Sequence, residues 1–443
     1  MKIKCIILCV ACWLPLTTSA EPLSLLTFYQ KAKQYDATIK SSRFENAAQQ
    51  EEIDKSFAAF LPQVKLSFYE GLGTTETQRI GQPTINQNGY NSRNYSFSVR
   101  QPLYNKASFA AYGQAKASGE RSKALLFKEE ISLSSRVTSA YLDLLLAADN
   151  VAYSKAQKES AEAQYEQAKR KYKSEVGTVT EISEAKANLE TVIAKSLEWE
   201  NYLEYAKRLL ENMTGVYSNA SWSLNLNKMP SNVAVSSNLE ELIEAAQLTN
   251  PEIVAARNEY LAASEGLEKN KSGHFPTLDL VASKTINESD TNFAIGSKFN
   301  TDAIGVQLNL PIYMGGYVSS SVRQALALTD QAREKLTETQ RRVGSDVRKY
   351  FNDVLNGLAR IKAYEESVKS YELSFVGTQK AYQAGLRSNV DILNAQDKLY
   401  SAKRDLAKER YQFIYNRVML KQSVGSLSEV DIAEVSEWFT YVP

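Results

Sequence analysis

The chain has 443 residues, of which 43% are hydrophobic and 23% are charged, so it is long enough for a large core or several domains. Its 52 basic and 51 acidic residues nearly balance, which argues against a nucleic-acid-binding surface. The cysteines, Cys5, Cys9 and Cys12, all lie at the start, so we expect packing or oligomerisation, and not disulfides, to hold the rest of the chain.

Residues 1–20 are predicted to be an export signal. A basic start, MKIK, precedes a short apolar run, and Thr18 and Ala20 suit signal-peptidase cleavage after Ala20. A lipid anchor at Cys12 is less favoured, because Cys9 stands where an aliphatic residue is expected. No later apolar run has the length of a transmembrane helix, so contact with a membrane would involve strands or a surface patch.

Prolines divide the remaining chain into segments of two kinds. None occurs in 103–229 or in 312–442, and an interior proline costs a helix about 3 kcal/mol, so both runs are predicted to form long helices. The other segments alternate apolar and polar residues, which is typical of strands. These predicted strands cover about residues 63–77, 92–103, 277–288 and 302–313.

Two interpretations of the strands remain open at this level. One is a soluble sheet with one buried face, which four strand signals favour when taken alone. The other is a transmembrane barrel, apolar toward lipid and polar toward a lumen. Four strands cannot close a barrel, and an open edge is not tolerated in lipid, so the barrel requires several copies of the chain.

The order of helices and strands occurs twice, which predicts a tandem duplication of about two hundred residues. The first repeat covers 21–217 and the second covers 239–427, with a linker at 218–238 and a tail at 428–443. Each repeat contains a helical hairpin with its tip at about 172–180 or 382–390. Aligned without a gap, the tips place Tyr172 over Tyr382 and Glu181 over Asp391.

Three segments together resemble the TolC-like outer-membrane efflux factor family. They read GHFPTLDLVAS (273–283), LNLPIYMGGYVSSSVRQA (308–325) and LRSNVDILNAQDKLYSAKRDLA (386–407). The resemblance implies an α+β membrane protein, a homotrimer in the outer membrane of a Gram-negative bacterium. Four strands per protomer would close one twelve-stranded barrel, long helical hairpins would form a periplasmic cylinder, and the linker and tail would form an equatorial belt.

The resemblance also implies function. The trimer would be the exit duct of a tripartite efflux or type I secretion system, opened by a periplasmic adaptor and an inner-membrane ABC or proton-driven pump. Drugs and unfolded proteins both remain open as cargo. No enzyme activity, cofactor or metal is implied, and the single histidine, His274, has no catalytic or metal-binding partners in a recognisable motif. The rival interpretation is a secreted coiled-coil adhesin or stalk, which would not need the duplicated strands.

By the same resemblance, the tips would form a periplasmic gate. Its residues would be Thr180, Glu181, Tyr382, Arg387 and Asp391, with Glu184 and Asn394 as possible neighbours. Glu181 replaces the family's usual aspartate, and Asn394 replaces a second one, so one carboxylate ring at Asp391 is expected. Tyr382 is expected to hydrogen-bond Glu181, and Arg387 to pair with Thr180 or Glu181. The basic run KRKYK at 169–173 is expected to be a solvated helix face.

Overall fold

The computed structural model describes residues 24–217, 221–225, 228–229, 238–290 and 295–442, so the predicted export signal lies outside the described residues. The described helices are α1 (Leu25–Tyr35), α2 (Ala37–Phe57), α3 (Lys106–Lys173), α4 (Val179–Thr214), α5 (Leu239–Thr249), α6 (Pro251–Lys271), α7 (Tyr317–Gln383), α8 (Asn389–Val424) and α9 (Glu429–Ser436). The described strands are β1 (Gln63–Thr77), β2 (Ile85–Asn105), β3 (Ser221–Leu224), β4 (Thr277–Glu288), β5 (Lys298–Asn309) and β6 (Phe439–Val442).

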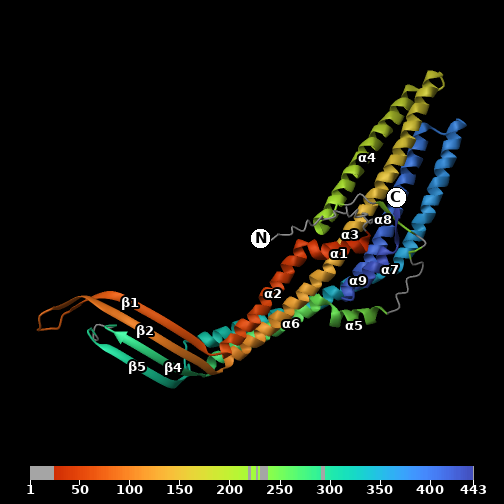
Figure 1. The fold of residues 1–443 in the computed structure, drawn as a ribbon. Helices are drawn as coiled ribbons and strands as arrows, with labels where there is room; N and C mark the ends of the chain where they lie inside the picture. The colour runs from red at the N-terminus through yellow and green to blue at the C-terminus, as the bar shows by residue number, and fades with distance from the viewer. Residues whose placement is uncertain (1–23, 218–220, 226–227, 230–237, 291–294, 443) are drawn as a thin grey trace, which may run out of the picture.

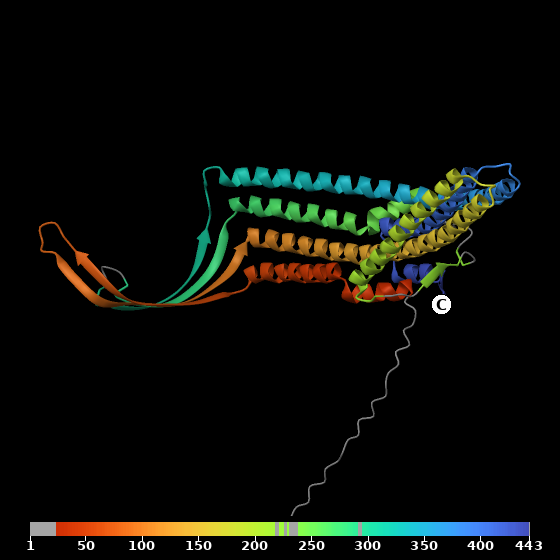
Figure 2. The same cartoon turned by 90° about the horizontal axis from the view of Figure 1, so that it is seen from above.

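The protomer is elongated, with a sheet at one end and two helical hairpins at the other (Figure 1). The strands of this sheet pair in the order β1-β2-β4-β5, and every pairing is antiparallel. Figure 2 shows the helices side by side in the order α2, α3, α6 and α7. In the chain they adjoin β1, β2, β4 and β5, so helices and strands follow the same order. The sheet and the helical layer are therefore one continuous wall with the same order of segments.

Two strands differ from the predicted ranges. β2 begins at Ile85 instead of about 92, because the polar residues 85–92 pair with the end of β1 beyond the four-stranded part of the sheet. β5 covers Lys298–Asn309 instead of 302–313. Its early residues pair with the end of β4, and it ends before Pro311, which lacks the amide hydrogen that a strand ladder uses.

The two faces of the sheet have different chemistry. Cross-strand register places Val64 beside Val99, Leu66 beside Phe97 and Phe68 beside Tyr95 on one face. The opposite face carries mainly small and polar residues, such as Ser67 paired with Ser96. β1 and β5 are the edges of the sheet within the protomer. An apolar outer face with two open edges is what a barrel shared among copies requires.

The two helical hairpins have nearly the same helix lengths. α3 has 68 residues and α4 has 36, while α7 has 67 and α8 has 36. At 1.5 Å per residue, α3 and α7 are each about 100 Å long. Close helix packing needs a glycine at one point: a Cβ on Gly357 would lie 2.5 Å from the ring of Phe413, which is fully buried.

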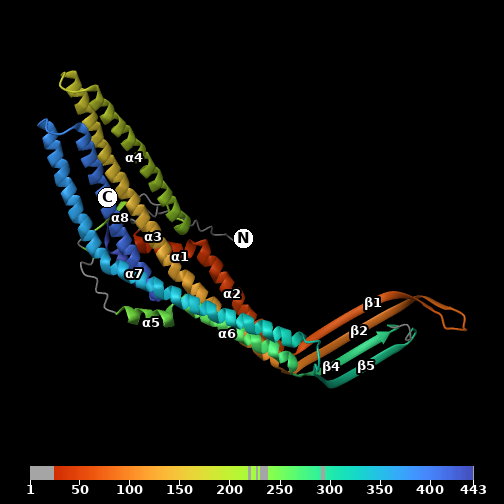
Figure 3. The ribbon, with the colours of Figure 1, turned by 180° about the vertical axis from the view of Figure 1, so that it is seen from behind.

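The core is concentrated where the helical layer meets the hairpins, in the middle of the molecule (Figure 3). Tyr141 of α3 is fully buried there, with its ring 5.3 Å from that of Phe439 and 5.9 Å from that of Phe28. β3 and β6 pair with each other, so a described part of the 218–238 linker lies beside the C-terminal tail. Among the helices that the structure describes, none combines the length and the apolar composition that crossing a bilayer requires.

Candidate functional site

Both hairpin tips are closed by the same backbone turn. In the first tip, the amide of Val176 donates to the carbonyl oxygen of Lys171 at 3.0 Å. In the second, the amide of Leu386 donates to the carbonyl oxygen of Ala381 at 2.9 Å. Each of these hydrogen bonds joins residues five positions apart. The residue before the donor has a positive φ, 61° at Glu175 in the first tip and 76° at Gly385 in the second. This is the usual hydrogen-bonded C-terminal cap of a helix, and it explains why the tips align without a gap.

Replacing Gly385 by Ala should destabilise the second tip, because a residue with a Cβ pays about 1–2 kcal/mol in the left-handed conformation. Hydrogen exchange at the amide of Leu386 is expected to become faster by about tenfold. Glu175→Ala is the matched control, since the first tip already holds a non-glycine residue at the same place. Equal exchange at Leu386 in the wild type and in Gly385→Ala would contradict this explanation of the turn.

The carboxylates of Glu181 and Asp391 cap the helices that follow the turns. Oε2 of Glu181 accepts the amide of Thr178 at 3.1 Å, and the amide of Glu181 donates to Thr178 Oγ1 at 3.2 Å. Oδ2 of Asp391 accepts the amide of Ser388 at 2.9 Å, and the amide of Asp391 donates to Ser388 Oγ at 3.2 Å. A carboxylate recurs at this position of both tips because it completes a capping box.

Arg387 lies within the second tip. Its Nη1 is 3.9 Å from Asp391 Oδ1, and both side chains are exposed enough for solvent to screen the pair. The pKa of Asp391 is lowered by hydrogen bonds from the backbone and side chain of Ser388, with a smaller contribution from the charge of Arg387. Asp391 is therefore ionised at neutral pH and carries its negative charge at the tip.

The two tips contact each other through Tyr382 and Lys171. The side chain of Tyr382 is only 5% exposed, although it lies next to the end of α7 at the second tip. The Nζ atom of Lys171 lies 3.7 Å from the ring centroid, which is cation–π geometry. The basic run 169–173 was expected to be a solvated face, and Arg170, Tyr172 and Lys173 are exposed, but Lys171 is half-buried against Tyr382.

The other predicted gate residues lie close to the tips. Thr180 is exposed on the first turn of α4, Asn394 is exposed on the second turn of α8, and Glu184 is half-buried on α4. Within a protomer, Glu181 bonds to the backbone of its own tip, and Arg387 faces Asp391 of the same tip. These side chains thus lie at or near the ends of α4, α7 and α8 that form the hairpin tips.

A buried glutamine contact joins the hairpins farther from the tips. Nε2 of Gln164 on α3 donates to Oε1 of Gln396 on α8 at 2.7 Å, and Nε2 of Gln396 donates to the carbonyl oxygen of Gln157 at 3.2 Å. Gln396 is 1% exposed, so breaking this contact would leave buried polar groups without partners. Nothing in the duplicated pattern marks these residues, since the two glutamines lie 232 positions apart.

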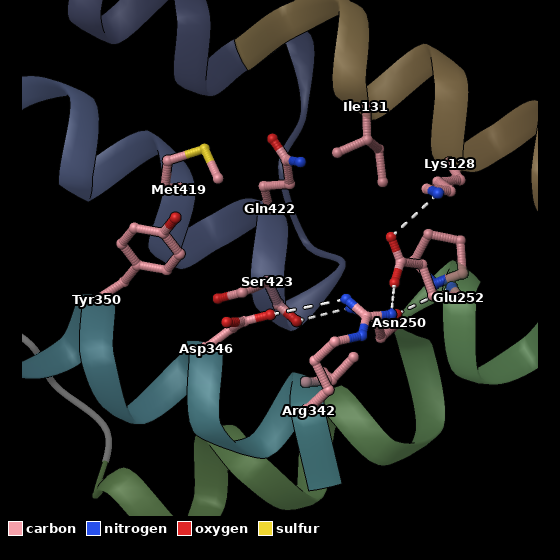
Figure 4. Close-up of a pocket in the computed structure, with 12 residues that line it drawn as sticks. Lys128, Ile131, Asn250, Glu252, Arg342, Asp346, Tyr350, Met419, Gln422 and Ser423 are labelled. Atoms are coloured by element: carbon pink, nitrogen blue, oxygen red, sulfur yellow. Dashed lines mark hydrogen bonds and ion pairs between the residues drawn. The ribbon is translucent and has the colours of Figure 1, made fainter. Parts of the chain in front are cut away.

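A polar pocket of about 230 Å³ lies in the middle region, between α3, α6, α7 and α8 (Figure 4). Its charges are neutralised within the protomer: Glu252 pairs with Lys128 at 3.2 Å and with Arg342, and Arg342 also lies 3.8 Å from Asp346. Burial opposes ionisation of Glu252, but the hydrogen bond from Arg342 and the positive charges of Lys128 and Arg342 outweigh it and lower its pKa. No group of three or more His, Cys, Asp or Glu side chains in the described part of the chain could hold a metal ion.

Comparisons with known proteins agree with this architecture. The family model described as outer membrane efflux protein matches residues 28–216 and 242–426, one segment in each repeat. The proteases secretion protein PrtF of Dickeya chrysanthemi is 29% identical, with 96% of this chain and 93% of that protein covered. The outer membrane protein TolC of Escherichia coli is 29% identical, with 92% and 83% covered. The alkaline protease secretion protein AprF of Pseudomonas aeruginosa is 28% identical, with 96% and 89% covered.

Solved structures show the same fold. A crystal structure of CusC superposes with a TM-score of 0.78 at 14% identity and covers 91% of this chain and 92% of its own. The outer membrane protein VceC of Vibrio cholerae superposes with a TM-score of 0.74 at 17% identity and covers 90% and 96%. The predicted architecture of long periplasmic helices with a β domain is therefore confirmed.

Proposed function

Because this chain belongs to the outer membrane efflux protein family, we propose that three copies of it assemble into one continuous duct through the outer membrane and the periplasm. Proteins of this family are passive exit ducts of efflux and type I secretion systems, and its channels are homotrimers that work with adaptor and pump proteins. Three four-stranded sheets would close a barrel of twelve strands, and three pairs of hairpins would surround the periplasmic passage.

The observation that carries this proposal is the sheet with one apolar face and two open edges, continued by helices of about 100 Å. Pairing β5 of one copy with β1 of the next leaves no open edge, which lipid requires. The polar face then lines a lumen, and the helical wall extends that lumen into the periplasm.

The assembly gives a direct prediction. The protein purified from outer membranes in mild detergent should have the mass of three chains, because a single sheet leaves two strand edges unpaired in lipid. Native mass spectrometry measures this, and deletion of residues 277–309, which removes β4 and β5, should abolish the trimer. A stable monomer that remains inserted in the membrane would contradict the proposal.

For cargo, we propose an unfolded secreted protein, passed on by an inner-membrane ABC pump and a periplasmic adaptor. Two relatives named for protease secretion match 96% of this chain and 93% or 89% of their own length, which supports this choice. Drug efflux is the second candidate, supported by the description of the family itself.

The two cargoes are separated by complementation. A host that lacks its own exit duct would receive this chain together with the ABC pump and adaptor of a protease secretion system. Appearance of the protease in the medium without recovery of antibiotic resistance supports the secretion role. Recovered resistance without protease export supports the efflux role.

We also propose that the hairpin tips form the periplasmic gate, with Thr180, Glu181, Tyr382, Arg387 and Asp391 at its constriction and Glu184 and Asn394 nearby. The position of these residues at the free ends of both hairpins supports this. The contact between Lys171 and Tyr382 adds a link within each protomer, so closing contacts would be of two kinds, within copies and between them.

A further inference from the structure

The apolar face of the sheet contains an ion pair among its hydrophobic residues. Register places Lys284 directly between Phe97 of β2 and Asp302 of β5, all on the face that carries Val99 and Leu66. Nζ of Lys284 lies 3.0 Å from Oδ1 and 3.3 Å from Oδ2 of Asp302. In the assembled barrel this face points toward lipid, where ionisable groups are costly and are usually retained for a function.

A hollow lies next to this pair. It has a volume of about 410 Å³ and is lined by Phe97, Ala282, Lys284, Asp302 and Ile304 among others. Ala282 lies between Val99 and Ile304 in the register, and its short side chain leaves space where larger residues on both sides project from the sheet. The hollow is thus apolar on the side nearer the helical end of the sheet, and the ammonium group of Lys284 lies on its other side.

The position of the pair along the strand places it in the outer half of the membrane. Lys284 is seven residues after Thr277, the first residue of β4 at the helical end, which corresponds to about 24 Å along the strand. A strand tilt of about 40° reduces this to a height of about 18 Å in an apolar band about 25 Å tall. Lysine also extends its ammonium group toward the nearer interface.

Charges continue on the same face toward the outer end of the sheet. Arg93 lies 2.7 Å from Glu70 and 3.6 Å from Glu288, and Glu288 is opposite Lys298 in the register. The outward face therefore changes from apolar to charged beyond the row of Phe68, Tyr95 and Ile286, which follows Lys284. This is the pattern expected where acyl chains give way to lipid head groups.

We propose that the hollow is a binding site for a phosphate-bearing lipid of the outer leaflet. An acyl chain lies over Ala282 between Phe97 and Ile304, and a phosphate oxygen accepts a hydrogen bond from Nζ of Lys284. The ammonium group has three donors, so the contact with Asp302 leaves capacity for the phosphate. Asp302 orients Lys284 and competes with the lipid for its charge. This site rests on the proposed barrel, since only closure of the sheet turns this face toward lipid.

The site is tested on the purified trimer with lipid A that carries two phosphates and with its dephosphorylated form. Native mass spectrometry counts the lipid bound at each concentration. Lys284→Gln is expected to weaken binding of the phosphorylated form at least tenfold, and Asp302→Asn is expected to strengthen it, because the competing carboxylate is lost. Lys65→Gln is the control, since Lys65 pairs with Ser98 on the opposite face of the sheet.

The opposite responses of the two variants separate lipid binding from a structural ion pair. A structural pair would make Lys284→Gln and Asp302→Asn equally harmful, and that result would overturn the site, as would unchanged binding in Lys284→Gln. Loss of preference for the phosphorylated lipid in the wild type would also overturn it. The trimer mass, measured in the same spectra, tests the proposed assembly separately, so failure of one proposal is distinguishable from failure of the other.

Discussion

Replacing Lys171 by Gln together with Arg387 by Ser is expected to raise the single-channel conductance of the trimer in planar bilayers. The first change removes the cation from the ring of Tyr382, and the second removes the exposed charge at the tip. A cation–π contact contributes about 0.5–2 kcal/mol, so an opening motion that separates the hairpins and breaks it in all three copies would cost about 1.5–6 kcal/mol. Each 1.4 kcal/mol corresponds to a tenfold change in the open population.

The hydroxyl of Tyr382 provides the control. Tyr382→Phe keeps the ring under Lys171, so a conductance close to wild type is expected, whereas Tyr382→Ala should open the entrance as Lys171→Gln does. If Tyr382→Phe opens the channel as much as Tyr382→Ala, the hydroxyl closes the gate instead, for example through the expected bond to Glu181 of a neighbouring copy. A double variant that is trimeric and conducts like the wild type would remove these residues from the gate.

Val306→Arg is expected to reduce the amount of trimer in the outer membrane far more than Gln307→Arg. Val306 lies beside Leu280 on the apolar face, farther from the helical end of the sheet than Leu308, and Gln307 lies beside Asp279 on the polar face. An arginine facing lipid costs about 2–4 kcal/mol near the midplane and less near the interfaces, whereas one facing the lumen remains hydrated. Because each trimer contains three copies, every assembled barrel would carry three lipid-facing arginines, and the free-energy cost is about three times as large.

The measurement is the heat-modifiable trimer band in the outer-membrane fraction at matched expression. Gln307→Arg controls for the size and charge of the new side chain at the neighbouring position of the same strand. Equal losses in the two variants would show that both faces of the sheet meet the same environment, which a membrane barrel excludes.

Much of the architecture could be predicted from local pattern. Long proline-free runs specify helices because proline removes a hydrogen bond and collides with the preceding turn, and α3 and α7 lie in these runs. Alternation specified where β1 and β4 lie, at Gln63–Thr77 and Thr277–Glu288, since side chains of a strand point to opposite faces in turn. The alternation of apolar and polar residues in four strands alone favoured a soluble sheet. It shows that one face is apolar, but not whether protein or lipid covers that face. Family membership decides for the outer membrane.

The capping role of the two tip carboxylates could also be predicted from the sequence. Thr178 followed by Glu181, and Ser388 followed by Asp391, have the spacing of a capping box, which is a local interaction between residues three apart. The family resemblance predicts these carboxylates as gate residues, whereas their hydrogen bonds in the protomer are with their own helix ends.

Only the tertiary structure decided which side chains meet across the two repeats. Lys171 reaches Tyr382, Gln164 reaches Gln396, and β3 in the linker pairs with β6 in the tail. Periodicity shows which face of a helix is apolar, but not the rotation and axial shift at which two long helices pack. The sequence by itself therefore determined the repeated segments and their types, whereas contacts between residues more than two hundred positions apart depend on how the finished helices pack together.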